Sequence, residues 1–280
     1  MVWLRLRSTE TELMDRRDAD RQRLIRTVAQ FRHINVLLTR YRYLLSRYIL
    51  RDLVGRVPRR VRVLDIGAGG GDMALWLDGR IRQLGHQPET VCVDSDPRIV
   101  AYAKRRAGGR PSVRVLQGTH RSLDHEPPFD YAFSNHLLHH LADSEIEEML
   151  SWLHRHVSRT YVMNDLLRSR ISELAFGAAS SLFFHGSFAR NDGLISIRRG
   201  FRPRELGRRA RAAGLRVLIR SQQQSALADV RAIVARDVSS DLPQASDQVL
   251  VRTTLPGRVY LVGRPGAEVG ETPTTSEVPQ

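Results

Sequence analysis

Short apolar runs alternate with longer segments of helical periodicity along most of the chain, which predicts an α/β fold. Five of these runs have the length of buried strands, and each passes directly into polar residues. The five strands are expected at residues 61–66, 91–93, 113–116, 129–133 and 160–163. Polar residues that follow parallel strands gather at one edge of the sheet, so a ligand crevice is expected there.

Helical patterns surround this core. Apolar residues recur at spacings of three and four over residues 9–55, and residues 166–200 contain an apolar segment, Ile171–Phe188, between the fifth strand and the next helix. Two further strands are expected at Leu215–Ile219 and Arg258–Val262. The expected organisation is an N-terminal helical cap at 1–57, a core domain at 58–265 with insertions at 166–200 and 221–257, and a disordered tail at 266–280.

A glycine-rich turn follows the first strand and gives the sharpest chemical signal. It reads Asp65-Ile-Gly67-Ala68-Gly69-Gly-Gly-Asp72, and glycine lets a ligand approach the backbone closely. A dinucleotide fingerprint would place glycine where Asp72 stands. Two acidic residues beside a pyrophosphate would also repel it. The turn therefore favours a cofactor with a positive sulfonium, a free amino group and no phosphate.

Asp94 ends the second strand, 27 residues after Gly67. A carboxylate at the end of the neighbouring strand can accept hydrogen bonds from both hydroxyls of a ribose. The following Asp96-Pro97 pair predicts a helix start, with Asp96 as the N-cap and Pro97 in the first helical position. Asp94 is therefore the expected ribose-binding residue.

These residues carry a family resemblance. Asp65-x-Gly67-x-Gly69 after an apolar strand resembles motif I of class I S-adenosylmethionine (SAM) methyltransferases. Ser-Asn-His-Leu-Leu-His-His-Leu at 134–141 resembles the ubiquinone/menaquinone-biosynthesis type. Further segments resemble actinobacterial methyltransferases found beside polyketide synthases, namely Glu12–Asp15, Phe31–Asn35, Asn164–Ser169, Asp192-Gly193 and Ser196–Arg199. The resemblance implies a seven-stranded, mostly parallel, Rossmann-like methyltransferase sheet with an N-terminal helical cap and inserted lid helices.

The resemblance also implies a position for SAM. The cofactor would lie across Gly67, Ala68 and Gly69, with its ribose on Asp94. Its adenine would lie near Ser95, Thr119 and His120, and its methionine end between Asp65, Asn135 and His136. Such proteins usually carry Asp where Thr119 stands, and the Thr119 hydroxyl would bond the adenine amino group more weakly. Arg40 or Arg42 is a candidate to bind the methionine carboxylate.

A hydroxyl or enol acceptor must lose its proton during methyl transfer, and histidine suits that role. His139 and His140 follow the fourth strand by one turn of helix, so either is a candidate general base. Both rings could equally pack the helix against the core. Asp165, with Asn164 beside it, ends the fifth strand and either orients or deprotonates the acceptor, or caps a loop.

No metal ion is expected from the sequence. His136, His139 and His140 have spacings that place side chains on one helix face. However, no carboxylate or thiol accompanies them nearby in the chain.

The expected reaction is SAM-dependent methylation of a small apolar aromatic, polyketide or quinone-like molecule, with O-methylation ahead of C-methylation. Lid helices rich in aromatic residues would favour an apolar acceptor and exclude water. These aromatic residues are Phe31, Tyr41, Tyr43, Phe176, Phe183, Phe184 and Phe188. The alternatives are an RNA methyltransferase and a non-catalytic SAM-binding or interaction protein.

Composition narrows the range of binding partners and cellular locations that we expect. The formal net charge is +14 and the pI is near 11.1, yet Lys104 is the only lysine among 44 basic residues, which indicates a bias toward arginine. No run of five basic residues occurs, so nucleic acid is disfavoured as a partner. The lone Cys92, the lack of an apolar leader and the lack of an 18-residue apolar stretch favour a cytoplasmic protein. The oligomeric state stays open, with a homodimer as one option.

Overall fold

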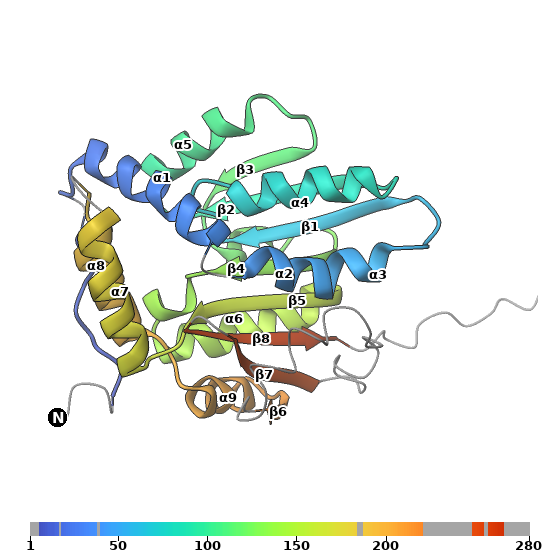
Figure 1. Ribbon diagram of the computed structural model, residues 1–280. Helices are drawn as coiled ribbons and strands as arrows, with labels where there is room; N and C mark the ends of the chain where they lie inside the picture. The colour runs from blue at the N-terminus through green and yellow to red at the C-terminus, as the bar shows by residue number, and fades with distance from the viewer. Residues whose placement is uncertain are drawn as a thin grey trace, which may run out of the picture.

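The computed structural model describes residues 6–16, 18–37, 40–183, 187–220, 248–254 and 257–265, without the side chains of 31–37, 179 and 181–183. An eight-stranded sheet with the order β3-β2-β1-β4-β5-β8-β7-β6 forms its centre (Figure 1). The strands are β1 (Arg60–Ile66), β2 (Gln87–Asp94), β3 (Val113–Gln117), β4 (Phe129–Asn135), β5 (Val157–Leu166), β6 (Arg216–Arg220), β7 (Gln248–Thr254) and β8 (Arg258–Arg264).

The sheet is mixed but mostly parallel, as the sequence predicts. Strands β1 to β5 pair in parallel, and β8 runs antiparallel to both β5 and β7. The sheet has eight strands rather than the seven expected, because β7 forms within the stretch assigned to the 221–257 insertion. The buried part of β7 consists of Val249, Leu250 and Val251. A run of this length cannot be distinguished from a loop by its periodicity. Residues 221–247 and the tail at 266–280 lie outside the described residues.

Helices cover both faces of the sheet. They are η1 (Leu13–Asp15), α1 (Arg21–Leu37), α2 (Tyr41–Leu45), the π-helical turn η2 (Ser46–Leu50), α3 (Arg51–Leu53), α4 (Asp72–Gln83), α5 (Pro97–Ala107), η3 (His120–Leu123), η4 (Leu138–His140), α6 (Asp143–His156), α7 (Arg170–Phe183), α8 (Ala189–Arg199) and α9 (Pro203–Ala212). Side chains of a strand alternate between faces, so Val61 and Val63 pack with α2 to α5, whereas Leu64 and Ile66 pack with α6 and α9.

Helices α1, α7 and α8 stand at the carboxyl ends of β1, β4 and β5 (Figure 1). Phe176 of α7 lies directly over Gly193 of α8, where a larger residue would overlap its ring. Of the aromatic residues expected in the lid, Tyr41 is buried against Phe133 of β4 and also lines the cavity described below, and Tyr43 is 42% exposed. The helices thus cover the edge of the sheet where the ligand crevice was expected.

The boundaries of the cap and core domains stay a prediction. Among the described residues, none of the helices is both long and apolar enough to cross a membrane.

The pairing of β5 with β8 provides a test of the core. Gly263 faces Tyr161, whose ring is fully buried and occupies the space that a Cβ would need. Gly263→Ala should therefore destabilise the protein by about 1–3 kcal/mol through overpacking. Thermal unfolding should show a decrease in Tm of roughly 2–4 °C for each kcal/mol.

The matched control is Gly79→Ala, in the middle of α4, where a Cβ would meet nothing within 4 Å. Because alanine favours the helix over glycine, this variant should gain about 0.5–1 kcal/mol. Equal Tm values for the two variants would contradict the packing described here.

Candidate functional site

A cavity of about 900 Å³ lies at the carboxyl edge of the sheet, between the glycine turn and helices α1, α7 and α8. This volume is typical of small-ligand sites, which span roughly 300–1,000 Å³. The lining includes nearly every residue that the sequence singled out, namely Asp65, Gly67, Ala68, Gly69, Asp94, Ser95, Thr119, His120, Asn135, His139 and His140. Asp165 is fully buried and reaches the cavity only through its contact with His139.

The glycine turn is held against the end of β2. Gly67 and Gly69 adopt left-handed φ angles of +67° and +55°, which glycine adopts without strain. The backbone N–H groups of Gly67 and Ala68 both donate to the carbonyl of Val93, at 2.9 and 3.1 Å. The N–H of Gly69 donates to Asp94 Oδ2 at 2.9 Å. The motif and the predicted ribose acid are therefore one connected unit.

Three carboxylates surround this turn. Asp72 forms an ion pair with Arg106. Asp65 is 4% exposed, and burial, followed by the charges of Asp94 and Asp72, raises its pKa well above the usual value. Burial also raises the pKa of Asp94, although backbone N–H groups of Asp96 and Gly69 oppose the shift. Such a group of acids favours a ligand that brings positive charge.

The loop after β3 carries the predicted adenine contacts. Thr119 immediately precedes the short helix η3, and its backbone N–H donates to Ser122 Oγ at 3.2 Å. His120 lies edge-on to Trp152, with 5.5 Å between ring centroids, and burial lowers its pKa. Thr119 therefore offers a neutral hydroxyl here and lacks the charge of an aspartate.

The arginines proposed for the methionine carboxylate lie elsewhere. Arg40 stacks on Tyr43 and Arg42 on Trp76. The cavity is instead lined by Arg258, at the start of β8, which is 4% exposed and donates to His136 Nε2 at 2.6 Å. Burial, followed by the charge of Arg258, holds the pKa of His136 well below its usual value. No sequence pattern marked Arg258 as a site residue.

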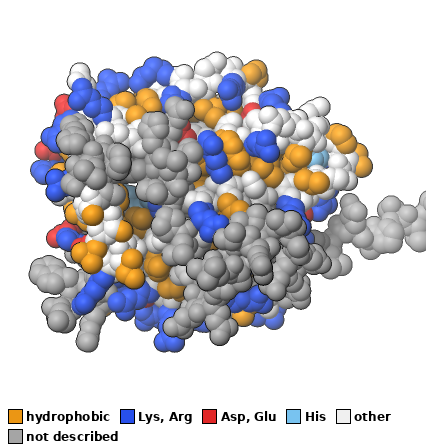
Figure 2. All heavy atoms as spheres, in the orientation of Figure 1, with side chains coloured by type: hydrophobic (Ala, Val, Ile, Leu, Met, Phe, Trp, Pro, Cys, Tyr) orange, Lys and Arg blue, Asp and Glu red, His pale blue; other side chains and the backbone are white. Residues whose placement is uncertain are grey.

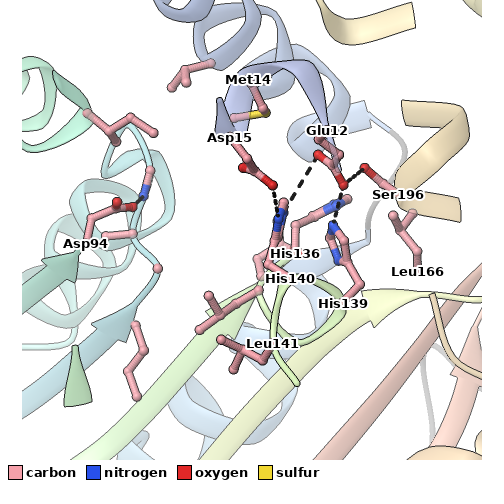
Figure 3. A pocket seen from close by; sticks show the side chains of 18 of the residues that line it. Glu12, Met14, Asp15, Asp94, His136, His139, His140, Leu141, Leu166 and Ser196 are labelled. Atoms are coloured by element: carbon pink, nitrogen blue, oxygen red, sulfur yellow. Dashed lines mark hydrogen bonds and ion pairs between the residues drawn. The ribbon is translucent and has the colours of Figure 1, made fainter. Parts of the chain in front are cut away.

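Two acids from the N-terminal segment, Glu12 and Asp15, complete the site (Figure 3). Neither was assigned a role from the sequence. Glu12 is 1% exposed, and Ser196 of α8 donates its hydroxyl to Glu12 Oε1 at 2.7 Å. The backbone N–H groups of Leu13 and Met14 donate to the carboxylate of Asp192, each at 2.9 Å. Helix α8 therefore fixes η1 above the histidines.

His139 is enclosed between two carboxylates. Its Nδ1 lies 2.7 Å from Asp165 Oδ1, and its Nε2 lies 3.4 Å from Glu12 Oε1. Burial disfavours the charged ring, but Asp165 and Glu12 outweigh it and raise the pKa of His139 to about 9. The pKa of Asp165 lies well below its usual range despite burial, because His139 is its partner. At neutral pH His139 therefore carries a proton and has both ring nitrogens occupied.

His140 occupies a more open position. Its ring is 24% exposed, and Nδ1 lies 2.9 Å from Asp15 Oδ2. Its Nε2 lies 3.9 Å from Glu12 Oε2, and its ring centroid lies 4.2 Å from that of His139 (Figure 3). Nearby, Asn164 donates its side-chain amide to Asn135 Oδ1 at 2.7 Å. Of the two candidate bases, only His140 presents its ring to the cavity with appreciable exposure.

Comparison with known proteins identifies a domain in this chain. Residues 63–160 match the family described as methyltransferase domain. None of the curated proteins matches the sequence.

Several solved structures are similar. Human N-acetylserotonin methyltransferase in complex with SAM gives a TM-score of 0.54 at 13% identity, over 88% of this chain and 57% of that one. A SAM-dependent methyltransferase from Aquifex aeolicus gives 0.51 at 15% identity, over 88% and 99%. An O-methyltransferase family protein from Burkholderia thailandensis gives 0.53 at 15% identity, over 95% and 67%.

At these identities the structural similarity establishes the fold, and this chain spans little more than half of the human protein's length. The match to the methyltransferase domain covers the glycine turn, Asp94 and the strand that precedes the histidines. Residues 63–160 therefore match a methyltransferase domain, and the fold around them is that of known SAM-dependent methyltransferases.

Proposed function

We propose that this protein transfers the methyl group of SAM to a small apolar aromatic, polyketide or quinone-like acceptor, with O-methylation ahead of C-methylation. One observation carries the proposal: the glycine turn, an apolar wall and the histidine cluster meet in one cavity. Such a cavity would place a polar cofactor and an apolar acceptor against each other.

The donor half is the acidic end of the cavity. Asp94 would accept hydrogen bonds from the ribose, and Ser95, Thr119 and His120 would surround the adenine. The sulfonium and ammonium groups of SAM would lie near Asp65 and Asn135, where they offset buried negative charge. The methyl group is already activated by the sulfonium, so the protein's main contribution is alignment, which can supply about 7–11 kcal/mol.

The acceptor half is apolar. Met14, Ile171, Phe176 and Ile197 line the cavity on the side of the lid helices. Arg258 lies in the same wall, where its guanidinium can donate a hydrogen bond to a carbonyl or phenolate oxygen. An aromatic or polyketide acceptor combines both features, since it carries such oxygens on an apolar frame.

In the proposed methyl transfer, one bond forms as another breaks. The acceptor oxygen forms a bond to the methyl carbon while the carbon–sulfur bond breaks, and the bonding electrons remain on sulfur in S-adenosylhomocysteine. The acceptor's proton passes to the histidine cluster, where His140 is the more exposed ring. Asp15 and Asp165 act as positioning residues, because each holds the Nδ1 of one ring.

Two further observations bear on the acceptor. The Burkholderia thailandensis structure carries the name of an O-methyltransferase family protein. On the part of the face in Figure 2 that is not grey, Lys and Arg side chains are scattered among apolar and neutral surface.

Asp94→Ala should weaken SAM binding by about 100-fold or more. The variant removes a charged acceptor from both ribose hydroxyls, and each such hydrogen bond contributes roughly 1.5–3 kcal/mol. Isothermal titration calorimetry with SAM measures the change. Asp130→Asn, at the amino end of β4 in an ion pair with Arg59, serves as the control and should bind SAM normally. Normal affinity in Asp94→Ala would contradict the cofactor position.

Asp65→Asn should make the ligand-free protein more stable, by an amount that grows from pH 5 to pH 8. The pKa of Asp65 is raised on folding by burial, Asp94 and Asp72, so the folded protein binds the extra proton above the unfolded pKa near 3.9. Stability therefore falls as pH rises through this window, and the amide removes that loss.

Thermal unfolding across this pH range tests the Asp65 prediction, with the exposed Asp18→Asn variant as control. Saturating SAM should raise the Tm of the wild type more than that of Asp65→Asn. A pH-independent difference between the two proteins would show that the charge of Asp65 is not the cause.

Labelled SAM incubated with panels of phenols, polyketide-like diketones, quinols and RNA tests the reaction itself. Label is expected in one of the small-molecule classes, and His140→Gln should lower kcat by roughly 10²–10⁴-fold. His125→Gln, an exposed histidine outside the cavity, should retain the wild-type rate. Label in RNA alone would overturn the proposed acceptor. SAM binding without turnover on any acceptor would instead favour a non-catalytic protein.

A further inference from the structure

Three ligating groups converge on one point of the cavity wall. The carboxylate of Glu12 and one ring nitrogen each of His139 and His140 lie within 4.8 Å of one another. They come from η1 and η4, two turns that are far apart in the sequence and face each other in Figure 3. No metal ion was expected from the sequence, because no acidic residue lies close to the histidines in the chain. The fold supplies the missing acid from the N-terminus.

The distances suit a metal ion. His139 Nε2 lies 3.4 Å from Glu12 Oε1, and His140 Nε2 lies 3.9 Å from Glu12 Oε2. Nitrogen and oxygen ligands at about 2.0–2.1 Å from a tetrahedral ion lie roughly 3.4 Å apart. The pair of Glu12 and His139 already has this spacing, and His140 Nε2 would approach Glu12 by about half an ångström on metal binding.

The second nitrogen of each ring is held as metal-binding histidines require. His139 Nδ1 lies 2.7 Å from Asp165 and His140 Nδ1 lies 2.9 Å from Asp15. A carboxylate at Nδ1 keeps the proton there, so the lone pair of Nε2 points away from it. Both lone pairs then face the oxygens of Glu12. The cation between them is either the proton that His139 carries in the metal-free protein or a metal ion that displaces it.

We propose that Glu12, His139 and His140 bind one divalent transition-metal ion, with Zn²⁺ and Fe²⁺ as the best candidates. Two imidazoles and one carboxylate form a ligand set that these ions favour, whereas Mg²⁺ and Ca²⁺ prefer oxygen ligands alone. Ser196 donates to Glu12 Oε1 and orients the carboxylate. All three ligands line the cavity, so the ion's remaining coordination positions face the acceptor space.

The role of this ion rests on the proposed function, whereas the site itself does not. An acceptor hydroxyl or enol oxygen that coordinates the ion would lose its proton more readily, because a bound cation stabilises the oxyanion. His140 would then serve as a ligand, and the proton would leave to solvent or to a nearby carboxylate. The donor half of the cavity is unchanged by this assignment.

Calorimetric titration of the full chain, freed of metal by a chelator, tests the site directly. Zn²⁺, and Fe²⁺ under anaerobic conditions, should each bind with a stoichiometry of one ion per chain, and Mg²⁺ should not compete. Glu12→Gln should weaken Zn²⁺ binding by at least 100-fold, because it removes the only anionic ligand. Asp15→Asn, which leaves the three ligands in place, should weaken it by about 10–100-fold.

Controls separate loss of metal from loss of fold. His125→Gln should bind Zn²⁺ as the wild type does, and each variant should still bind SAM, which reports a folded domain. Anomalous diffraction at the zinc edge should give a peak between Glu12, His139 and His140. A peak elsewhere, sub-stoichiometric binding, or an unchanged affinity in Glu12→Gln would overturn the site.

Activity then distinguishes the site from the proposed function. Methyl transfer should fall at least 10-fold in the chelated wild type and return on addition of Zn²⁺ or Fe²⁺. Equal rates with and without metal would overturn the ion's role while leaving SAM-dependent transfer intact. A zinc peak at the three ligands in a protein that methylates no acceptor would support the site and overturn the proposed function.

Discussion

Buried negative charge at the carboxyl edge of the sheet is the constraint around which this structure is built. Asp65, Asp165 and Glu12 are buried, and Asp94 lines the cavity. A carboxylate in such a place is stable only with a cation or several hydrogen bonds beside it. His139 meets this need for Asp165 and Glu12, and backbone N–H groups meet part of it for Asp94.

Asp65 and Asp94 have fewer such partners, which is the basis of the proposed preference for a cationic cofactor. SAM brings a sulfonium and an ammonium group, whereas a dinucleotide would bring further negative charge. The same reasoning explains why Asp72 is tolerated where a dinucleotide-binding turn has glycine, since Arg106 neutralises it and also donates to the carbonyl of Gly70 within the turn. The acidic residues of the cavity and the match to the methyltransferase domain therefore both favour SAM as the cofactor.

The sequence predicted the features that are local. Asp65, Gly67 and Gly69 follow a strand and precede a helix, and Asp94 ends the adjacent strand, so topology alone brings them together. It did not reveal Glu12, Asp15 or Arg258, because their partners lie more than 120 residues away along the chain. From the sequence alone, an acidic residue near the N-terminus cannot be distinguished from a solvated surface residue. Its place in the site becomes evident only once η1 is seen to pack against α8. Strand β7 was missed for a related reason, since its three buried residues become recognisable only beside β8.

In the proposed arrangement the N-terminal turn lies in the wall of a cavity that holds the cofactor at one end and the acceptor at the other. A crystal structure with S-adenosylhomocysteine and Zn²⁺ tests this arrangement most directly. The account predicts the ribose hydroxyls on Asp94 and the sulfur atom directed across the cavity toward His140, with the ion between Glu12 and the two rings. A nucleoside bound away from Asp94, or a sulfur atom directed away from the histidines, would contradict it.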